Sequence, residues 1–325
     1  MNFYYQRDKL FISLFFIFAT STLAGQNISP SVKIITSGAI TDFFIEDPEI
    51  ILVTDAGTIE WYNFKTGQKT NFIQLPKIKD FMGDEVPAKI FSVDKLNDQL
   101  IYVTQGIHGF RNVVIRQRKD EKKVIDANID RLLVKKVRFI NEKEILLGLM
   151  SNEIMLFDIE KNEMVYKLPI SAYTFSDFDL SRDNQFVYTS DESGIVHKID
   201  IQKGKVVKDF SCNNVDNIYK LVYRNETIIT AGQDRRVGVY QALIGDKYYL
   251  QKNFLIYCVG LNENGTVGAY TADEENNITL FDINTKSEIT KLTGHQSVIT
   301  KIEFVDDHTL ISASDDRYLM IWKIE

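Results

Sequence analysis

The chain has 325 residues, of which 44% are apolar and 26% are charged, and its formal net charge is −7. The composition excludes an intrinsically disordered chain, and the length allows one large domain with a full core. No basic tract with interleaved aromatic residues offsets the negative charge, so nucleic acid is excluded as a favoured partner.

The first segment of the chain has the form of an export signal. Arg7 and Lys9 precede an apolar run at residues 10–19, and small residues follow this run up to Ala24. The run is too short for a membrane-spanning helix, which needs about 20 apolar residues. We therefore expect a signal peptide at residues 1–24, cleaved after Ala24.

The rest of the chain, residues 25–325, is expected to be one exported domain without a stable membrane anchor. Gln26 stands where the similar signal of bacterial lipoproteins needs Cys, so no lipid can be attached there. We expect the domain in the periplasm, with secretion as the alternative. Cys212 lies in a polar connection and Cys258 in an apolar strand pattern, so two free thiols are expected rather than a disulfide.

A repeat with a period near 41 residues runs through this domain. One apolar or aromatic residue near the end of a strand marks each repeat, and the gaps between successive markers are 53, 42, 42, 41, 41 and 41 residues. The seven markers are Tyr62, Ile115, Phe157, Ile199, Tyr240, Phe281 and Trp322. Such regular spacing indicates one structural unit repeated seven times.

Each repeat contains four strand-like segments in the same order. An apolar run and the marker strand are separated by Gly, Asn, Asp or Ser, which is typical of a β-hairpin. Another strand precedes the hairpin, and a more polar strand follows most markers. The preceding strands carry apolar residues at Ile40, Phe43 and Ile45; Ala88, Phe91 and Val93; Val134, Val137 and Phe139; Phe175, Phe178 and Leu180; Ile218, Leu221 and Tyr223; Ile256, Val259 and Leu261; and Ile299, Ile302 and Phe304. This pattern predicts an all-β, seven-bladed β-propeller.

The two ends of the domain predict how the ring closes. The seventh repeat stops shortly after Trp322 and lacks a fourth strand, whereas residues 31–37, "SVKIITS", form a spare strand before the first repeat. If this N-terminal strand pairs with the last blade, two exposed strand edges disappear. We therefore expect a closed, monomeric disc in which residues 31–37 form the outer strand of the seventh blade.

The seventh repeat resembles a WD40 repeat. A Gly-His pair ending at His295 precedes its first strand, Ser312 and Asp316 lie in its hairpin, and Trp322 ends its third strand. The resemblance implies a buried tetrad of His295, Ser312, Asp316 and Trp322 that stabilises the blade through hydrogen bonds. Lys323 replaces the Asp of the family's Trp-Asp pair, and the other repeats match the motif only in part.

The sequence contains no catalytic or metal-binding motif beyond this repeat. Ser, His and Asp are the residue types of an acyl-transfer triad, but no Gly-x-Ser-x-Gly turn or oxyanion loop accompanies them. The four histidines have no second ligand at His-x-His or His-x-x-x-His spacing. A propeller enzyme would line its channel with convergent carboxylates or metal ligands, and no such set is evident. We expect no catalysis, no metal and no cofactor.

The marked departure from the 41-residue period lies in the second repeat. Strands a, b, c and d of an antiparallel blade bring the d–a and b–c loops to one face of the disc, and the a–b and c–d loops to the other. The additional residues lie in the d–a connection at 76–87 and the b–c loop at 105–112, so both emerge on the same face. We expect an apolar and cationic protrusion that binds a partner protein, because loops on a rigid scaffold concentrate binding residues. Its candidate residues are Phe81, Met82, His108, Phe110 and Arg111.

The surroundings of this protrusion are expected to be acidic. The b–c loops of the fourth and sixth repeats carry Asp191, Glu192, Asp273 and Glu274. A partner would then meet the protrusion beside a negatively charged rim, which fits a protein surface of mixed charge. The alternative is a tolerated surface insertion that packs its own aromatic residues.

Together these features favour a non-catalytic protein-interaction platform over a propeller enzyme or quinone-binding protein. The export signal, the repeats and stretches such as "SDFDLS" and "DESG" are similar to the NapL-type accessory proteins encoded with periplasmic nitrate reductases. This resemblance implies a role in supporting a molybdenum enzyme, with a periplasmic partner such as a nitrate reductase component and no cofactor of its own. The alternative is a chaperone-like propeller scaffold of envelope assembly.

Overall fold

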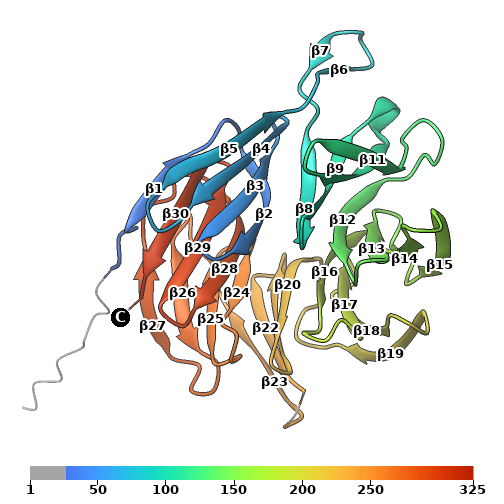
Figure 1. Ribbon diagram of the computed structural model, residues 1–325. Coiled ribbons are helices and arrows are strands. Elements are labelled where there is room, and N and C mark those ends of the chain that lie inside the picture. The colour runs from blue at the N-terminus through green and yellow to red at the C-terminus, as the bar shows by residue number, and fades with distance from the viewer. Residues whose placement is uncertain (1–26, 243, 325) are drawn as a thin grey trace, which may run out of the picture.

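A computed structural model describes residues 27–242 and 244–324, and the expected signal peptide lies outside this part of the chain. The described residues form β-strands and one short 3-10 turn, Ile107–Gly109, and none of their helices could cross a membrane. Seven four-stranded antiparallel sheets surround a common centre (Figure 1). The prediction of an all-β, seven-bladed propeller is therefore confirmed.

Each blade consists of strands a to d, counted from the centre outwards. The strands of blades one to four are β2 (Ile40–Glu46), β3 (Glu49–Thr54), β4 (Thr58–Asn63) and β5 (Gln68–Gln74); β8 (Ile90–Leu96), β9 (Gln99–Gln105), β10 (Arg111–Gln117) and β11 (Asp120–Ile125); β12 (Val134–Phe139), β13 (Glu144–Leu149), β14 (Glu153–Asp158) and β15 (Glu163–Pro169); and β16 (Phe175–Leu180), β17 (Phe186–Asp191), β18 (Val196–Asp200) and β19 (Lys205–Phe210). Those of blades five to seven are β20 (Ile218–Arg224), β21 (Thr227–Gly232), β22 (Arg236–Gln241) and β23 (Asp246–Gln251); β24 (Val259–Leu261), β25 (Val267–Thr271), β26 (Ile278–Asp282) and β27 (Glu288–Leu292); and β28 (Ile299–Asp306), β29 (Thr309–Ser314), β30 (Tyr318–Lys323) and β1 (Val32–Ile35). A short hairpin of β6 (Ile78–Lys79) and β7 (Glu85–Val86) connects blades one and two.

The apolar cores lie between neighbouring blades, which explains why the same pattern recurs in every repeat. Each of seven apolar clusters combines residues of two adjacent blades. Neighbouring blades cover strands b and c on both faces, so the sequences of these strands are nearly continuous apolar runs, such as "EILLGL" in β13. The outer strands have one solvated face and are mostly exposed, as β5 and β15 are.

The ring closes through strands from the two ends of the domain. Strand β1 pairs antiparallel with β30, with Val32 opposite Ile321 and Ile35 opposite Tyr318. Beyond β1, the backbone N–H of Ser37 donates to the buried Glu60 of blade one at 3.0 Å. The N-terminal strand therefore completes blade seven as predicted and also ties it to blade one.

The inner strand of blade two has a different register from the predicted one. Ile90 and Val93, both 0% exposed, occupy the core positions to which the sequence pattern assigned Ala88 and Phe91. The error is a shift of two residues, which arose because Ala88 is itself apolar and buried and has the expected spacing from Phe91. As a result, Phe91 lines the central channel instead of the core.

Candidate functional site

A β-bulge near the start of the innermost strand recurs in six of the seven blades. In blade one it lies between Ile40 and Asp42. A bulge sets two residues of one strand against a single residue of the next, so the consecutive residues Thr41 and Asp42 both line the central channel. The channel wall is therefore richer in side chains than a regular alternation would make it.

The lining side chains of the innermost strands form three layers along the channel. We call the face with the d–a and b–c loops the upper face, and the opening of the channel on it the upper mouth. From the upper mouth downwards, the layers are Thr41, Phe91, Lys135, Ser176, Tyr219, Tyr257 and Thr300; then Asp42, Ser92, Lys136, Asp177, Lys220, Cys258 and Lys301; then Phe44, Asp94, Arg138, Asp179, Val222 and Glu303. The cavity that they enclose has a volume of about 580 Å³.

The channel carries many charges that the sequence analysis did not bring together. Eight Lys or Arg and six Asp or Glu side chains line it, so the channel is net cationic in a chain of net charge −7. The expectation that no convergent carboxylates line the channel is wrong, because Asp42, Asp94, Asp177 and Asp179 meet there. One feature of the sequence could have indicated this charged lining. Charged residues occur within the otherwise apolar inner strands, as in "ITDFFI", "VKKVRF" and "FSDFDL".

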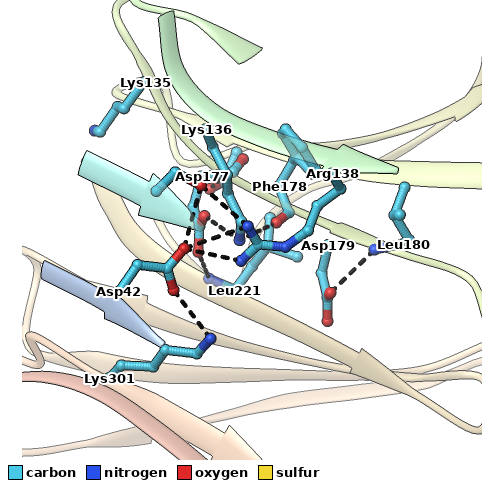
Figure 2. Close-up of polar contacts among 12 residues, drawn as sticks. Asp42, Lys135, Lys136, Arg138, Asp177, Phe178, Asp179, Leu180, Leu221 and Lys301 are labelled. Carbon is cyan, nitrogen blue, oxygen red and sulfur yellow. Dashed lines mark hydrogen bonds and ion pairs between the residues drawn. The ribbon is translucent and has the colours of Figure 1, made fainter. Parts of the chain in front are cut away.

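Cations of other blades neutralise the carboxylates in the middle of the channel (Figure 2). Asp42 lies 3.0 Å from the ammonium of Lys301 and 3.2 Å from the guanidinium of Arg138. Arg138 belongs to blade three and Asp42 to blade one, so this ion pair links two blades that are not adjacent in the ring. Lys136 forms a further ion pair with Asp177 of blade four at 2.8 Å.

These contacts lower the pKa of two buried carboxyl groups, whereas burial raises the pKa of Asp94. Burial disfavours the charged form of Asp42, but Lys301 and Arg138 outweigh it and lower the pKa far below its usual range. The same balance lowers the pKa of Asp177, with Lys136 as the strongest opposing charge. Carboxylates with such low pKa values are poor general bases near neutral pH, so their arrangement suits the linking of blades.

The upper mouth differs because its cations have no carboxylate partner. Within the described part of the chain, no ion pair within 4.0 Å is formed by Lys89, Arg111 or Lys135 at the mouth, or by Lys220 in the layer directly below. Lys135 donates only to the backbone oxygen of Phe175 at 3.3 Å, and Figure 2 shows it apart from the ion-paired cluster. The mouth is therefore the part of the channel where positive charge is in excess.

Arg111 reaches this mouth from the b–c loop of blade two. Its guanidinium lies 3.6 Å from the ring centroid of Phe91 and donates to the backbone oxygen of Val134 at 2.7 Å. Its Nε is buried and has no hydrogen-bond partner among the residues that the structure describes. Burial lowers the pKa of Arg111 to about 10.

Lys135 is surrounded mainly by like charges. Burial lowers its pKa most and the positive charge of Lys220 lowers it further, whereas the carboxylate of Asp177 acts in the opposite direction; with the smaller lowering effects of Arg111 and Lys136, the pKa is about 8. On the side of blades five and six, the rings of Tyr219 and Tyr257 stack with their centroids 5.5 Å apart. The mouth thus combines repelling cations with an aromatic wall.

The structure places the five predicted partner-binding residues in three separate features of the upper face. Phe81 and Met82 lie at the tip of the β6–β7 hairpin, 92% and 72% exposed, and the hairpin stands away from the blades (Figure 1). His108 is exposed in the 3-10 turn, and Phe110 is half-buried. Arg111 instead belongs to the channel mouth, and no hydrogen bond, ion pair or ring contact between described residues joins it to the hairpin.

The four tetrad residues of blade seven form one hydrogen-bonded chain. His295 lies 3.0 Å from Asp316 through Nδ1 and 2.7 Å from Ser312 through Nε2, and Trp322 donates from Nε1 to Ser312 at 2.8 Å. Burial disfavours the charged form of Asp316, but hydrogen bonds from His295 and from two backbone N–H groups lower its pKa overall. None of the four lines the channel, which agrees with a structural arrangement.

A second buried polar network in blade four was missed from the sequence. Asp191 was expected on an acidic rim, but it is 0% exposed and accepts hydrogen bonds from Asn152 and Ser171, each at 2.8 Å. His197 lies 2.8 Å from Asp209 and 3.5 Å from Asp191. Such partners are what permit a buried carboxylate, and they remove Asp191 from the surface.

The rim is therefore less acidic than expected, and the thiols are free. Of the four acidic residues, Glu192 and Glu274 are exposed, whereas Asp273 is half-buried and lies 3.6 Å from Lys291. Cys212 is exposed and Cys258 is buried, without a disulfide between them, as the sequence suggested. In the described ranges, no group of three or more His, Cys, Asp or Glu residues is positioned to hold a metal ion.

Comparisons with known proteins agree with this geometry. The WD domain, G-beta repeat family matches residues 286–323, which include the strands β27 to β30 and the whole hydrogen-bonded tetrad. Residues 286–323 form a WD40 repeat. The remaining blades keep the propeller geometry with weaker sequence motifs.

Two relatives extend the comparison beyond this repeat. The solved β-propeller domain of Cps50 (Swd1) from Myceliophteria thermophila has a TM-score of 0.72 and 15% identity, covering 91% of this chain and 99% of that domain, and so supports the fold alone. U3 small nucleolar RNA-associated protein 5 of Saccharomyces cerevisiae is 25% identical over 182 residues, which is 55% of this chain. The match spans only 22% of that protein's length.

Proposed function

We propose that this protein is a non-catalytic scaffold that binds another protein on its upper face. The observation that carries the proposal is the gathering of an exposed apolar hairpin tip, Phe81 and Met82, and a cationic channel mouth on one face of a closed disc. WD40 propellers typically serve protein–protein interaction, and their rigid blades present loops as a continuous surface. An exposed aromatic residue and an Arg on the same face are residue types that are enriched among interface anchors.

The chemistry of the channel favours binding over catalysis. A general base needs a pKa near the working pH, whereas Asp42 and Asp177 are held as carboxylates by Lys and Arg partners. The Ser-His-Asp set of blade seven is engaged with Trp322 and lies outside the channel lining. These groups are committed to linking strands and blades.

The proposed location is the periplasm, with a periplasmic nitrate reductase system as the partner. This finer proposal rests on the export signal at residues 1–24 and on the similarity to NapL-type accessory proteins. The envelope-assembly scaffold is the second candidate, and it shares the export signal. Cell fractionation tests the location, and cross-linking to nitrate reductase subunits tests the partner. A chain that remains in the cytoplasm with an uncleaved N-terminus would contradict both proposals.

Affinity capture with matched variants tests the scaffold proposal. The double variant Phe81→Ser and Met82→Ser is expected to reduce recovery of the bound partner at least tenfold, because it removes the exposed apolar anchor without touching a core. Arg182→Ser is the control, since Arg182 is 91% exposed and lies in an a–b loop on the lower face. Equal recovery by the parent and the double variant, or loss with the control alone, would contradict the upper-face assignment.

A further inference from the structure

We propose that the upper mouth binds a carboxylate carried by an acidic segment of the partner protein. The inference rests on the proposed scaffold function and names the chemistry that the partner must carry. The residues assigned to the carboxylate are Lys89, Arg111, Lys135 and Lys220, which come from blades two, three and five.

The first support is the contrast between paired and unpaired cations of the same channel. Lys136, Arg138 and Lys301 each have a carboxylate within 3.2 Å. Lys135 at the mouth and Lys220 in the layer directly below it have none within 4.0 Å in the described part of the chain. Asp315 also borders the mouth, and the positive charge of Lys89 acts to lower its pKa. The two side chains are nevertheless too far apart to form an ion pair within 4.0 Å. An incoming carboxylate would give these cations the kind of partner that their neighbours already have.

The second support is the unsatisfied donor of Arg111. A buried polar group without a partner costs free energy, commonly about 1–3 kcal/mol, and Arg111 Nε is such a group among the described residues. Stacking on Phe91 fixes the plane of the guanidinium. Each terminal nitrogen makes one hydrogen bond, to Val134 O at 2.7 Å and to Met150 Sδ at 3.6 Å. Three of the five guanidinium N–H groups, including the Nε–H, therefore make no hydrogen bond to a described residue.

The third support is the repulsion stored around Lys135. Its ammonium is held near Lys220, Arg111 and Lys136, and this surrounding together with burial brings its pKa down to about 8. An anion in the mouth would offset the repulsion, so binding and protonation of Lys135 would support each other. The chain as a whole is anionic at −7, so the mouth differs in sign from the net charge of the protein.

A protein carboxylate fits these features better than a free phosphate. Phosphate is often bound bidentately by the two terminal nitrogens of an Arg, and both terminal nitrogens of Arg111 already make a bond within the protein, to Val134 O and to Met150 Sδ. The stacked rings of Tyr219 and Tyr257 offer an apolar wall for the aliphatic stem of a Glu side chain. The exposed tip at Phe81 and Met82 lies on the same face and would contact the rest of the segment.

Binding of three probes to the full chain tests the inference. The probes are a fluorescent six-residue Glu/Asp peptide, the same peptide with Gln and Asn in place of Glu and Asp, and inorganic phosphate, all at matched ionic strength. The acidic peptide is expected to bind at least tenfold more tightly than the amide peptide. The double variant Lys135→Met and Lys220→Met is expected to weaken its binding at least tenfold.

The control variant removes the same charge from the lower face. Lys161→Met with Lys203→Met changes two exposed lysines in c–d loops and is expected to alter binding less than twofold. Equal binding of the acidic peptide by the parent and the Lys135/Lys220 variant, or no binding at about 1 mM, overturns the inference. Binding of phosphate without binding of the peptide overturns it as well, because the ligand would then be a free anion. If peptide binding fails while the Phe81/Met82 variant still loses partner capture, the scaffold proposal stands without this inference.

Discussion

Lys135 and Lys136 are adjacent in sequence, yet they meet opposite electrostatic surroundings. The bulge in β12 turns both side chains toward the channel. Lys136 reaches Asp177 at 2.8 Å, whereas Lys135 donates to a backbone oxygen and Asp177 only partly offsets the cations around it. One lysine therefore joins two blades, and the other keeps a partly compensated charge at the upper mouth.

Replacing each lysine is expected to change stability in opposite directions. Lys135→Met is expected to raise the free energy of unfolding at pH 7 by about 1–2 kcal/mol, because it removes a buried charge that its neighbours repel. Lys136→Met is expected to lower it by about 3 kcal/mol, because it leaves the Asp177 carboxylate buried without its ion-pair partner. Urea unfolding measures both values, and stabilisation by neither variant, or by both, would contradict this assignment of charges.

The pH dependence of the same pair follows from the pKa of Lys135. Its pKa is about 8 in the folded protein and 10.5 when unperturbed. Below pH 8 both states are protonated and the folded state carries the full repulsion of Lys220, Arg111 and Lys136, offset in part by Asp177. Between pH 8 and 10.5 the folded protein releases this proton first, so the contribution of Lys135 to stability rises with pH. The difference in free energy of unfolding between Lys135→Met and the parent protein is therefore expected to shrink between pH 7 and pH 10. A difference that stays the same over this range would contradict the low pKa of Lys135.

The tetrad of blade seven is expected to contribute stability. Trp322 is 0% exposed and donates to Ser312, so Trp322→Ala is expected to cost about 3–5 kcal/mol. Trp322→Phe keeps most of the ring but loses the donor, and its cost is expected to be about 1–2 kcal/mol. Thermal and urea unfolding measure both. A Trp322→Ala variant within 0.5 kcal/mol of the parent, taken as the scatter of about ±0.5 kcal/mol for neutral surface changes, would contradict a structural role.

Sequence reasoning reached the tetrad but not the mouth, and the difference is local geometry. His295, Ser312, Asp316 and Trp322 lie at motif positions in one repeat, so their contacts follow from spacing. The mouth depends on the bulge, which breaks the alternation of side chains and brings Lys135 to the channel beside Lys136. It also depends on which blades face each other, which spacing alone does not determine.

At the scale of elements, β1 determines whether the disc is closed. This strand covers the edge of β30, and the following Ser37 is held by Glu60 of blade one. Its core residue Ile34 is 4% exposed and packs with apolar residues of blades one and seven. The closure was predictable because the repeat count left one strand missing at the end and one spare at the beginning.

Deleting residues 31–37 is expected to lower the melting temperature and to cause self-association, because the edge of β30 becomes exposed. Deleting residues 80–84, the tip of the β6–β7 hairpin, is the control and is expected to leave both properties unchanged. Differential scanning calorimetry and light scattering measure them. A monomeric 31–37 deletion with the melting temperature of the parent would contradict closure by this strand.

The register of β8 shows the limit of pattern matching for a single element. Ala88, Phe91 and Val93 have apolar spacing that matches the other inner strands, and the sequence alone gives no reason to prefer Ile90. The structure selects Ile90 and Val93 because both pack in the core between blades one and two, which leaves Phe91 beneath Arg111. Phe91 can stack on the guanidinium of Arg111 because of this two-residue shift in register.

At the scale of the whole molecule, the channel differs in charge from the chain that encloses it. The net charge is −7, yet the channel has more cations than carboxylates, and the unpaired cations lie at the upper mouth or in the layer directly below it. Fields of this kind steer association and weaken with salt. A partner with an acidic segment is therefore directed to the upper face, where the apolar hairpin tip supplies further contact.

Site-specific photo-cross-linking tests the central claim of an upper binding face most directly. Benzoylphenylalanine replaces Phe81 or His108 on the upper face, and Arg182 or Lys203 on the lower face, in cells that contain the native partners. The same discrete cross-linked product is expected from both upper positions and from neither lower position. A product formed from Arg182 or Lys203, and absent from Phe81 and His108, would contradict the account.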